Sequence, residues 1–457
     1  GGDSSGEVRC AGGALAGTNG DGYCAPEFTG PECQLCADEN QYLVNGDNCV
    51  DCPARGRKFL GPLLLWLGCC VAVGVAAYLY KKQSWRERRY IGPPLRLTDR
   101  MVALHSLLGM QAKLKLLLSF YQVVTVIPSI YGVTLPQRYT NWLDGITEVI
   151  SPSNWMPIPC VTYTQLLLPY VITPLGLALS LLLLGVGMGF SQWHALPAPR
   201  PPPLRAVAAG LIEVLPATLV LIYCSVPPIN AYIFRFWRCK MYAWDDIHTY
   251  GVMVEQPSIF CASDEYDSIF RRYIIGSIVI WPVGSMVLYS SLLVACYKPL
   301  HAKLHTALTQ ASAFLHQDYE TQWFWWEALE LARRLVLTGA VTAIIPSERA
   351  FVRLVLATLI STLHTCGIAV VRPFKRVEDD VLAVATSLTT LLVFLTANWI
   401  FIFDRFVEIF PGENSFLVNV LGFHEVDGIV TVMISLIFSV LFLFMIGAII
   451  AARRVAK

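Results

Sequence analysis

Long apolar runs almost free of charge dominate this sequence, and they constrain its fold more than any other feature. A helix that crosses a lipid bilayer needs about 20 consecutive, mainly apolar residues, and runs of that kind recur along the chain. Hydrophobic residues make up 55% of the 457 positions and charged residues only 15%, and the mean hydropathy is +0.53. Such a composition leaves too few polar side chains for a water-soluble surface. We therefore expect an all-α polytopic membrane protein.

Nine segments are predicted to span the membrane. They cover about 59 to 80, 112 to 134, 162 to 190, 204 to 228, 273 to 297, 326 to 346, 350 to 371, 381 to 403 and 428 to 452. Nine is an odd number, so the two termini are expected on opposite sides. The segments assigned to the cytoplasm hold 17 Lys and Arg residues, against 11 in the outer segments next to the spans, which agrees with the positive-inside rule.

The cysteines indicate that the N-terminus lies outside. Six of the 14 cysteines fall in the first 52 residues, which contain no apolar run long enough for a core. So small a segment folds only when it is cross-linked, and disulfides persist in oxidising compartments. Six cysteines permit 15 pairings. The alternative is a zinc site made from two Cys-x-x-Cys pairs; the six are Cys10, Cys24, Cys33, Cys36, Cys49 and Cys52.

A second disulfide is predicted in the longest outer loop, residues 229 to 272. Cys239 and Cys261 flank a polar stretch there and face the oxidising side. The acidic residues of this loop offer oxygen ligands for Ca²⁺, although their spacing matches no EF-hand loop. The alternative is that they are solvated acids; they are Asp245, Asp246, Asp264, Glu265 and Asp267. We expect no other metal and no cofactor.

The sixth predicted span carries ionisable residues at membrane depth. Glu330 precedes Arg333 and Arg334 by three and four residues, on one helical face with Glu327. Glu213 in the fourth span lies at a similar depth and is a candidate partner for either arginine. Charges in a bilayer need partners or a wet cavity, so we expect a network. It either gates the helical bundle or is a buried ion pair that fixes helix register.

Two further features modify individual spans. Lys113 and Lys115 lie near the inner end of the second span, and we expect their side chains to extend to the cytoplasmic interface. Proline residues inside or at the ends of other spans predict kinked or broken helices. They are Pro169, Pro174, Pro216, Pro227, Pro228 and Pro282.

The loop between the last two spans is strongly acidic. Its short apolar segment, residues 416 to 422, is either a strand or a short re-entrant helix. Acidic residues at the mouth of a re-entrant helix concentrate cations at a pore, whereas an ordinary solvated loop is the alternative. Arg405 is the one basic residue of the loop, and its acidic residues are Asp404, Glu408, Glu413, Glu425 and Asp427.

Two classes of function are not expected. The sequence contains no Gly-x-Ser-x-Gly, Walker, His-Glu-x-x-His or dinucleotide-binding motif, so we do not expect an enzyme. The net charge of +1 provides no overall basic field, which argues against a nucleic-acid partner.

The stretch from Cys24 to Cys33, followed by Cys36, Cys49 and Cys52, resembles the closing half of an EGF-like or laminin-type module. The resemblance implies the pairs Cys24–Cys33 and Cys36–Cys49. It would make the first segment a small disulfide-rich extracellular module.

Most of the chain resembles large protist and algal surface proteins in which EGF-like repeats precede a multi-span domain similar to transient-receptor-potential or polycystin channels. The matching segments are Gly30-Pro-Glu-Cys33-Gln-Leu-Cys36 through Cys49-Val-Asp-Cys52-Pro, residues 113–122, Trp281-Pro-Val-Gly284, Trp325-Trp-Glu327-Ala-Leu-Glu330-Leu-Ala-Arg333-Arg334, and Arg372-Pro-Phe374 with Glu378-Asp-Asp380. The resemblance implies a sensor-like bundle in spans four to seven and a pore pair in spans eight and nine. A channel of this type would need several subunits.

The resulting domain organisation has four parts. Residues 1–57 form the extracellular module, 58–203 the first three spans with their linkers, 204–380 the sensor-like bundle, and 381–457 the candidate pore hairpin. The leading hypothesis is a cation-permeable channel subunit in the plasma, ciliary or flagellar membrane, acting as a homo-oligomer or within a larger surface assembly. One alternative is a receptor or an anchor that binds an extracellular protein, matrix or appendage. The other is a secondary transporter, which the proline-broken spans suggest.

Overall fold

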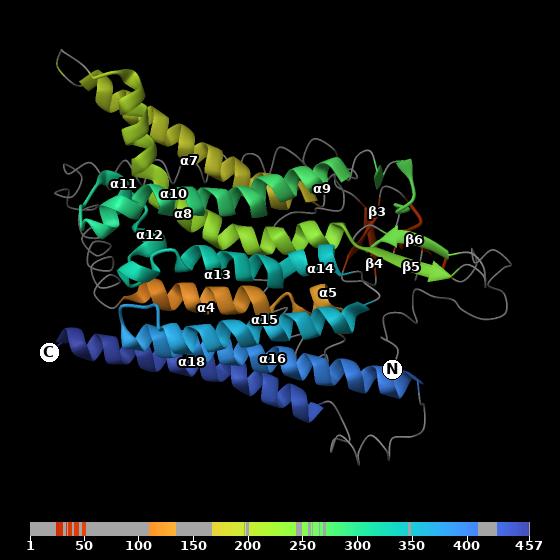
Figure 1. Cartoon of the computed structure of the whole chain (residues 1–457). Coiled ribbons are helices and arrows are strands. Elements are labelled where there is room, and N and C mark those ends of the chain that lie inside the picture. Colours follow the sequence, from red (N-terminus) through yellow and green to blue (C-terminus); the bar gives the residue numbers. More distant parts are fainter. Residues whose placement is uncertain are drawn as a thin grey trace, which may run out of the picture. The chain divides into compact units, whose positions relative to one another are not determined.

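The computed structural model describes the chain in several ranges. These are residues 24–30, 33, 35–38, 41–44, 48–51, 109–133, 167–195, 197, 201–243, 249–254, 257, 259–264, 266–267, 271–345, 349–409 and 427–456. Most of these residues are helical, and three small sheets of two strands each accompany the helices (Figure 1).

Seven helical segments of the described residues are long and apolar enough to cross a bilayer. The chain is therefore an integral membrane protein. The helices are α4 with α5 (Met110–Val124 and Ile127–Tyr131), α7 (Leu167–Ala195), α8 (Pro203–Phe236), α9 with η6 and α10 (Arg271–Ile278, Val279–Val283 and Gly284–His301), α15 (Ala350–Val371), α16 (Val377–Ile409) and α18 (Asp427–Ala456).

The remaining two predicted spans have different outcomes. The first, about 59 to 80, lies outside the described residues. The sixth is helical, as α13 (Trp326–Leu335), η8 (Val336–Ala340) and α14 (Val341–Ile344). It does not qualify as an apolar span because its first turns carry four charged side chains, most of them buried against other helices. The described part of the chain thus holds seven strongly apolar spans and one charged, buried helix.

Helix α8 is longer than predicted. Pro216, Pro227 and Pro228 lie inside the helix, which continues to Phe236. Proline removes one backbone donor, but neighbouring groups in a membrane bundle can compensate for that loss, so these prolines do not end the helix. Strands β5 (Cys239–Ala243) and β6 (Thr249–Met253) follow as an antiparallel hairpin. The predicted outer loop, residues 229 to 272, therefore contains regular structure. The predicted disulfide between Cys239 and Cys261 is also present.

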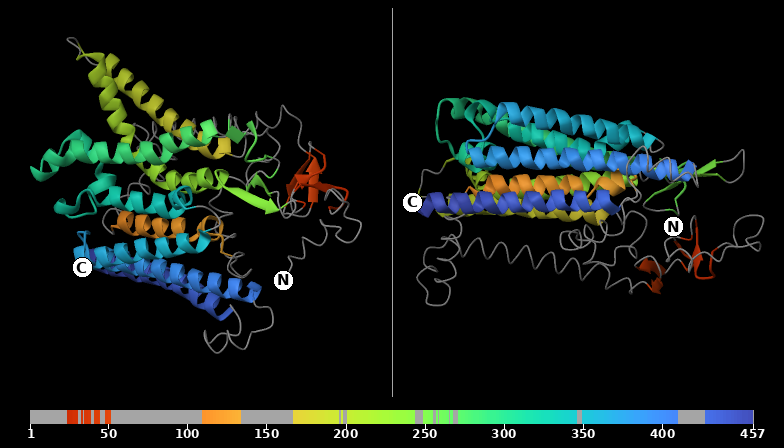
Figure 2. Two further views of the ribbon diagram at one scale, coloured as in Figure 1. Left: turned by 45° about the vertical axis from the view of Figure 1, so that its right-hand side comes forward. Right: turned by 90° about the horizontal axis from the view of Figure 1, so that it is seen from below.

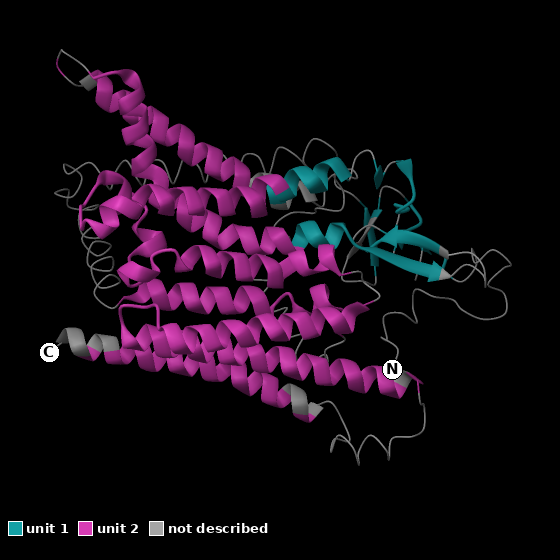
Figure 3. Cartoon of the chain, in the orientation of Figure 1, with its two compact units in different colours: residues 1–71, 150–173, 232–278 teal, residues 72–149, 174–231, 279–457 magenta. Residues whose placement is uncertain are grey.

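The chain divides into two compact units (Figure 3). Unit 1 comprises residues 1–71, 150–173 and 232–278. It contains the small antiparallel pairs β1 (Phe28–Thr29) with β2 (Leu35–Cys36) and β3 (Gln41–Val44) with β4 (Asn48–Asp51). Disulfides join Cys24 to Cys33 and Cys36 to Cys49, which are the pairs that the resemblance to an EGF-like module implies.

Unit 2 comprises residues 72–149, 174–231 and 279–457, and its helices lie side by side (Figures 1 and 2). Helix α4 contacts α13, α16 and α18, and α15 packs along α16. Their shared core contains Phe120, Val123, Phe394 and Ile437, each 2% exposed or less. In Figure 1, α4, α13 and α16 begin at the end of the bundle where α15 ends. The polar first turns of three helices therefore meet.

Candidate functional site: a buried charge network

Lys113 on α4 is buried and does not extend to the interface, so that prediction was wrong. Its side chain is 1% exposed, and Nζ lies 2.6 Å from Oδ1 of Asp379, whose side chain is 3% exposed. The side chain of Lys113 also lies beside Gly447 of α18. Asp379 lies in the first turn of α16. The ion pair therefore forms where α4, α16 and α18 meet. The Asp379 carboxylate, which is far away in the sequence but adjacent in the fold, neutralises the Lys113 ammonium, so the ammonium does not need contact with water.

Lys115 lies two residues after Lys113 on α4, and hydrogen-bond acceptors and aromatic rings surround its ammonium group. Its Nζ lies 2.6 Å from Glu327 Oε2 and 3.5 Å from Asp318 Oδ2, and it donates a hydrogen bond to the Phe314 carbonyl at 2.7 Å. The same nitrogen lies 4.5 Å from the centre of the Phe314 ring. The Tyr319 hydroxyl donates to Glu327 Oε2 at 3.0 Å. This lysine is therefore held by α13 and by the segment before it.

Arg334 on α13 is fully buried. Its guanidinium carbon lies 4.0 Å from the centre of the Tyr223 ring, a cation–π contact. Nη1 donates to Oε1 of Gln122 at 3.1 Å, and Nη2 lies 3.6 Å from Oε1 of Glu327. Tyr223 in turn donates its hydroxyl to the Lys115 carbonyl at 2.7 Å. The arginine thus joins α13 to α4 and α8.

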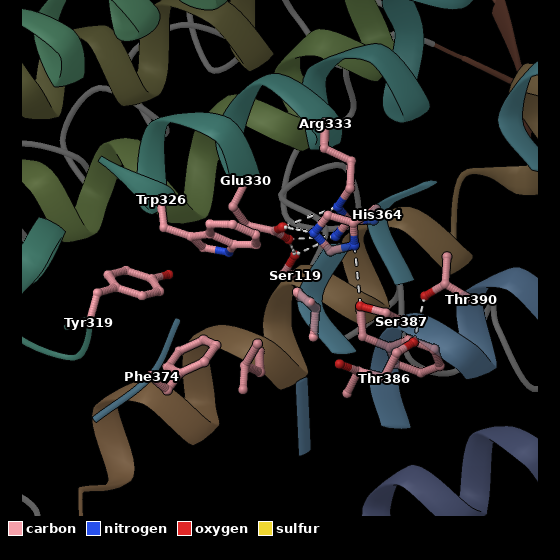
Figure 4. A pocket seen from close by; sticks show the side chains of 13 residues that line it. Ser119, Tyr319, Trp326, Glu330, Arg333, His364, Phe374, Thr386, Ser387 and Thr390 are labelled. Carbon is pink, nitrogen blue, oxygen red and sulfur yellow. Dashed lines mark hydrogen bonds and ion pairs between the residues drawn. The ribbon is translucent and has the colours of Figure 1, made fainter. Parts of the chain in front are cut away.

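Glu330 is the centre of a second cluster (Figure 4). Arg333 Nε donates to Glu330 Oε2 at 3.1 Å, and the Ser119 hydroxyl donates to Oε1 at 2.8 Å. His364 of α15 places Nε2 2.9 Å from Oε2, and its Nδ1 lies 3.3 Å from the Ser387 hydroxyl of α16. A cavity of about 20 Å³ adjoins these groups, which is room for about one water molecule.

The ion pairs described above involve four basic and four acidic side chains, so their formal charges balance. The α-helical period places Glu327, Glu330 and Arg334 on the buried face of α13. Removing one partner of a buried pair costs about 3–5 kcal/mol, so the balance is a condition for burying the whole set. We call the set the charge network: Lys113, Lys115, Arg333 and Arg334, with Asp318, Glu327, Glu330 and Asp379, and with His364 beside them.

Glu213 bonds elsewhere, so its predicted role as a partner of either arginine is corrected. It lies on α8 and is exposed, and its Oε2 accepts a hydrogen bond from Gln192 of α7 at 3.2 Å. The backbones of α7 and α8 approach closely at Gly185 and Gly210, where a Cβ would clash. This close contact places Glu213 beside α7, while Ser119 and Gln122 of α4 bind the arginines.

The predicted pore residues lie largely outside the described part of the chain. Asp404 is on α16 and is partly exposed. Glu408 and Asp427 belong to the ends of α16 and α18, but their side chains are outside the described residues, as are Glu413 and Glu425.

Acidic residues of the outer loop form no metal site in the described ranges. Asp267 there makes an exposed ion pair with Arg271 at 3.5 Å. Among the residues that the structure describes, no group of three or more His, Cys, Asp or Glu side chains could hold a metal ion. Asp245, Asp246 and Glu265 lie outside those residues.

Titratable groups at the end of the bundle extend the network outside the spans. Burial raises the pKa of Tyr319 well above its usual value, and the carboxylates of Glu327 and Glu330 act in the same direction. Tyr319 therefore remains a phenol that donates to Glu327. Burial lowers the pKa of His316, which lies on α12 (Ala313–His316) and is 8% exposed. Its neutral form is favoured in the fold.

Several members of the site were missed at the level of sequence. Ser119 and Gln122 continue the polar spacing of Lys115 along one face of α4, which was an available signal. His364 is an ionisable residue in a strongly apolar segment. Ionisable residues inside membrane-spanning segments often belong to functional sites, so His364 was a second available signal. The pairing of Lys113 with Asp379 had no local signal, because 266 positions separate the two residues.

The whole chain matches no protein-family model, no curated protein and no solved structure. The membrane helices and the charge network are therefore the features that bear on its function.

Proposed function

We propose that this protein is a subunit of a cation-permeable membrane channel, in which α16 and α18 line the pore and the charge network controls the position of α16. One observation carries the proposal: the buried Lys113–Asp379 pair joins the first turn of α16 to α4 beside Gly447 of α18. Charges are buried in membranes at high cost, and they commonly mark ion pathways and sensors.

The packing of α16 supports the same function. Its inner face is fully buried at Val393, Phe394 and Ala397 against α4, α15 and α18. A shift of α13 or α4 would therefore move α16 as well, because the helices are joined by close side-chain packing. A close-packed core changes between discrete arrangements and does not absorb such a shift gradually. The acidic residues of the loop after α16 would concentrate cations at the pore mouth. The resemblance to polycystin-like surface proteins points to the same class.

A pore of this kind requires an oligomer, because a single helical hairpin cannot enclose a path. Outward-facing side chains of α18 are exposed in the single chain, among them Val432, Phe438, Phe442 and Met445. In the proposed assembly, part of this face contacts the neighbouring subunit and part contacts lipid.

Cation flux into liposomes that contain the full-length chain tests the proposal. The variants are Asp379→Asn and Glu330→Gln, which keep side-chain shape and remove charge. We expect wild-type flux of monovalent cations and a change of at least about tenfold in open probability in both variants, corresponding to about 1.4 kcal/mol in the gating equilibrium. Glu213→Gln is the matched control, because Glu213 is exposed and bonds to Gln192. Absence of flux in the folded wild type would overturn the proposal.

The strand region of unit 1 favours a second candidate function, an anchor or receptor. Two disulfides within 26 residues, Cys24–Cys33 and Cys36–Cys49, stabilise a small polar module of the kind that serves for extracellular binding. Folded, correctly inserted protein that conducts no cations but retains binding to an extracellular protein would favour this function over the channel.

A further inference from the structure

His364 lies beside the charge network, and the channel proposal makes no use of its protonation. We propose that Glu330, His364 and Ser387 form a buried proton-binding site, whose ligand is a proton delivered through water in the adjoining cavity. This inference does not rest on the channel function, because it concerns the protonation of one imidazole inside the bundle.

The geometry gives each ring nitrogen of His364 a polar neighbour. Nε2 lies 2.9 Å from Glu330 Oε2, and Nδ1 lies 3.3 Å from the Ser387 hydroxyl. In the neutral ring of the proposed site, Nε2 carries the hydrogen and lies beside the carboxylate at ion-pair distance, while Nδ1 accepts a hydrogen bond from Ser387. A second proton binds at Nδ1, which then donates to the Ser387 oxygen, and the hydroxyl hydrogen turns away. The ring gains one proton and one positive charge, and no other bond changes.

The charges around the ring come from α13. Glu330 stabilises a protonated imidazole, whereas Arg333, which binds the same carboxylate, opposes it. The cavity lining from other elements is uncharged at neutral pH, because burial keeps the Tyr319 phenol protonated. Its polar members are Ser119 of α4, Tyr319 of the segment before α13, and Thr386, Ser387 and Thr390 of α16, and the rest of that lining is apolar.

The cavity makes the site accessible to a proton without exposing it to bulk solvent. Figure 4 shows Ser119, Glu330, His364, Ser387 and Thr390 around the same space. Its volume of about 20 Å³ accommodates about one water molecule. The His364 side chain is only 8% exposed. A water at this position would have polar partners on four helices, α4, α13, α15 and α16, and it could transfer a proton to the imidazole.

Proton binding would change the contacts of α16. The otherwise balanced network gains a positive charge, and Ser387 changes from donor to acceptor towards His364. Because Ser387 belongs to α16, the protonation state of a residue on α15 is communicated to the neighbouring helix. The site therefore couples proton binding to the α15–α16 contact.

Solid-state NMR of the full chain in liposomes, with isotope-labelled histidine, tests the inference directly. We expect one histidine signal that is absent from His364→Gln but present in His305→Gln, a variant of an exposed histidine. At about pH 8 this signal should report the neutral ring with hydrogen on Nε2, and by about pH 4 the doubly protonated ring.

Two further variants keep the imidazole and separate the roles of its neighbours. Glu330→Gln should lower the proton affinity of His364 by about tenfold or more, a shift of about one pH unit in the midpoint. Ser387→Ala should change the ratio of the two neutral tautomers. A His364 signal that stays in one protonation state over the whole range, or a midpoint that Glu330→Gln leaves unchanged, would overturn the inference.

Discussion

At the residue scale, two lysines of α4 are buried ionisable side chains, and each has an acidic partner on another helix. Lys113 and Lys115 sit near the end of an apolar helix, a position from which lysine side chains usually reach the interface. Both are buried because α16 and α13 supply Asp379 and Glu327 at 2.6 Å. Such partners are visible only once the helices pack. The Glu330–Arg333 contact, by contrast, was predictable from a separation of three residues on one helix.

Asp379→Asn should destabilise the fold, because it leaves the buried ammonium of Lys113 without its counter-charge. We expect a loss of about 3–5 kcal/mol, measured as the free energy of unfolding in detergent micelles. The double variant Lys113→Met with Asp379→Leu should recover most of that loss, since it removes both charges. Asp267→Asn is the control, because the Asp267–Arg271 pair is about two-thirds exposed and should contribute about 1 kcal/mol or less. Equal effects at both sites would contradict this account.

His316 predicts a pH dependence of stability. Burial lowers its pKa in the fold below the ordinary value of 6.5, so the unfolded chain binds a proton more readily there. Its contribution to stability is therefore fully present above pH 6.5 and is lost as the pH falls through 6.5 towards the lower pKa of the folded state. The melting temperature of wild type should fall more than that of His316→Gln between about pH 7.5 and about pH 5.5. Parallel curves for the two proteins would exclude this contribution.

At the element scale, hydrophobic run length located most helices but not their ends. Seven of the eight predicted segments between 112 and 452 correspond to the seven apolar helical segments of the described residues, of which α9–η6–α10 is one. The exception is the segment that begins with α13. It carries more charged residues than an apolar span, and these residues are tolerated because the helix packs inside the bundle. Pro227 and Pro228 predicted the end of α8 at residue 228, yet the helix continues to Phe236. Proline weakens a helix locally, and tertiary contacts decide whether the helix ends there.

The π-helical turn η8 is stabilised by side chains from other helices. The Asn230 amide of α8 donates to the Leu335 carbonyl and to Thr338 Oγ1, both at 2.9 Å. The Tyr131 hydroxyl donates to the Leu337 carbonyl at 3.0 Å. A π turn shifts the backbone hydrogen-bond register, so nearby carbonyls need donors from elsewhere. π turns are frequent at functional sites, and this one directly follows Arg334.

Asn230→Leu should therefore destabilise the protein by about 1–3 kcal/mol, because the Leu335 carbonyl at the start of the π turn and the Thr338 hydroxyl within it lose their donor. Tyr131→Phe should cost about 1 kcal/mol for its single hydrogen bond. Unfolding by denaturant, monitored through tryptophan fluorescence, provides the measurement. Thr362→Val is the control, since the Thr362 hydroxyl bonds only within its own helix, to the Thr358 carbonyl. An effect of Asn230→Leu no larger than that of the control would show that η8 does not need this donor.

At the scale of the whole molecule, distant segments meet in one site. Most of the charge network comes from three segments that are far apart in the sequence, residues 113–122, 325–334 and 378–380. Sequence spacing predicted that charges of the sixth segment would need partners, but it could not identify α4 and α16 as their source. It proposed Glu213 instead, on the basis of depth alone, and depth does not determine which helices are neighbours.

The direction of the chain through unit 2 depends on the charged helix. The helices α13, η8 and α14 form one continuous segment of 19 residues from Trp326 to Ile344, about 28 Å at 1.5 Å per residue. That length suffices to cross the hydrocarbon core, which is about 30 Å thick. The cost of its charges is offset because they are paired inside the bundle. We therefore expect this segment to cross the membrane, although its composition is not that of an apolar span.

Thiol labelling on both sides of this segment is the most direct test of the account. Glu320→Cys lies before α13 and Arg349→Cys lies after α14, and both positions are exposed. With every cysteine outside the Cys24–Cys33, Cys36–Cys49 and Cys239–Cys261 disulfides replaced by Ser or Ala, a membrane-impermeant maleimide should label Arg349→Cys on intact cells. It should label Glu320→Cys only after the membrane is permeabilised. Labelling of both cysteines from the same side would contradict the crossing, and with it the burial of the charge network inside the membrane.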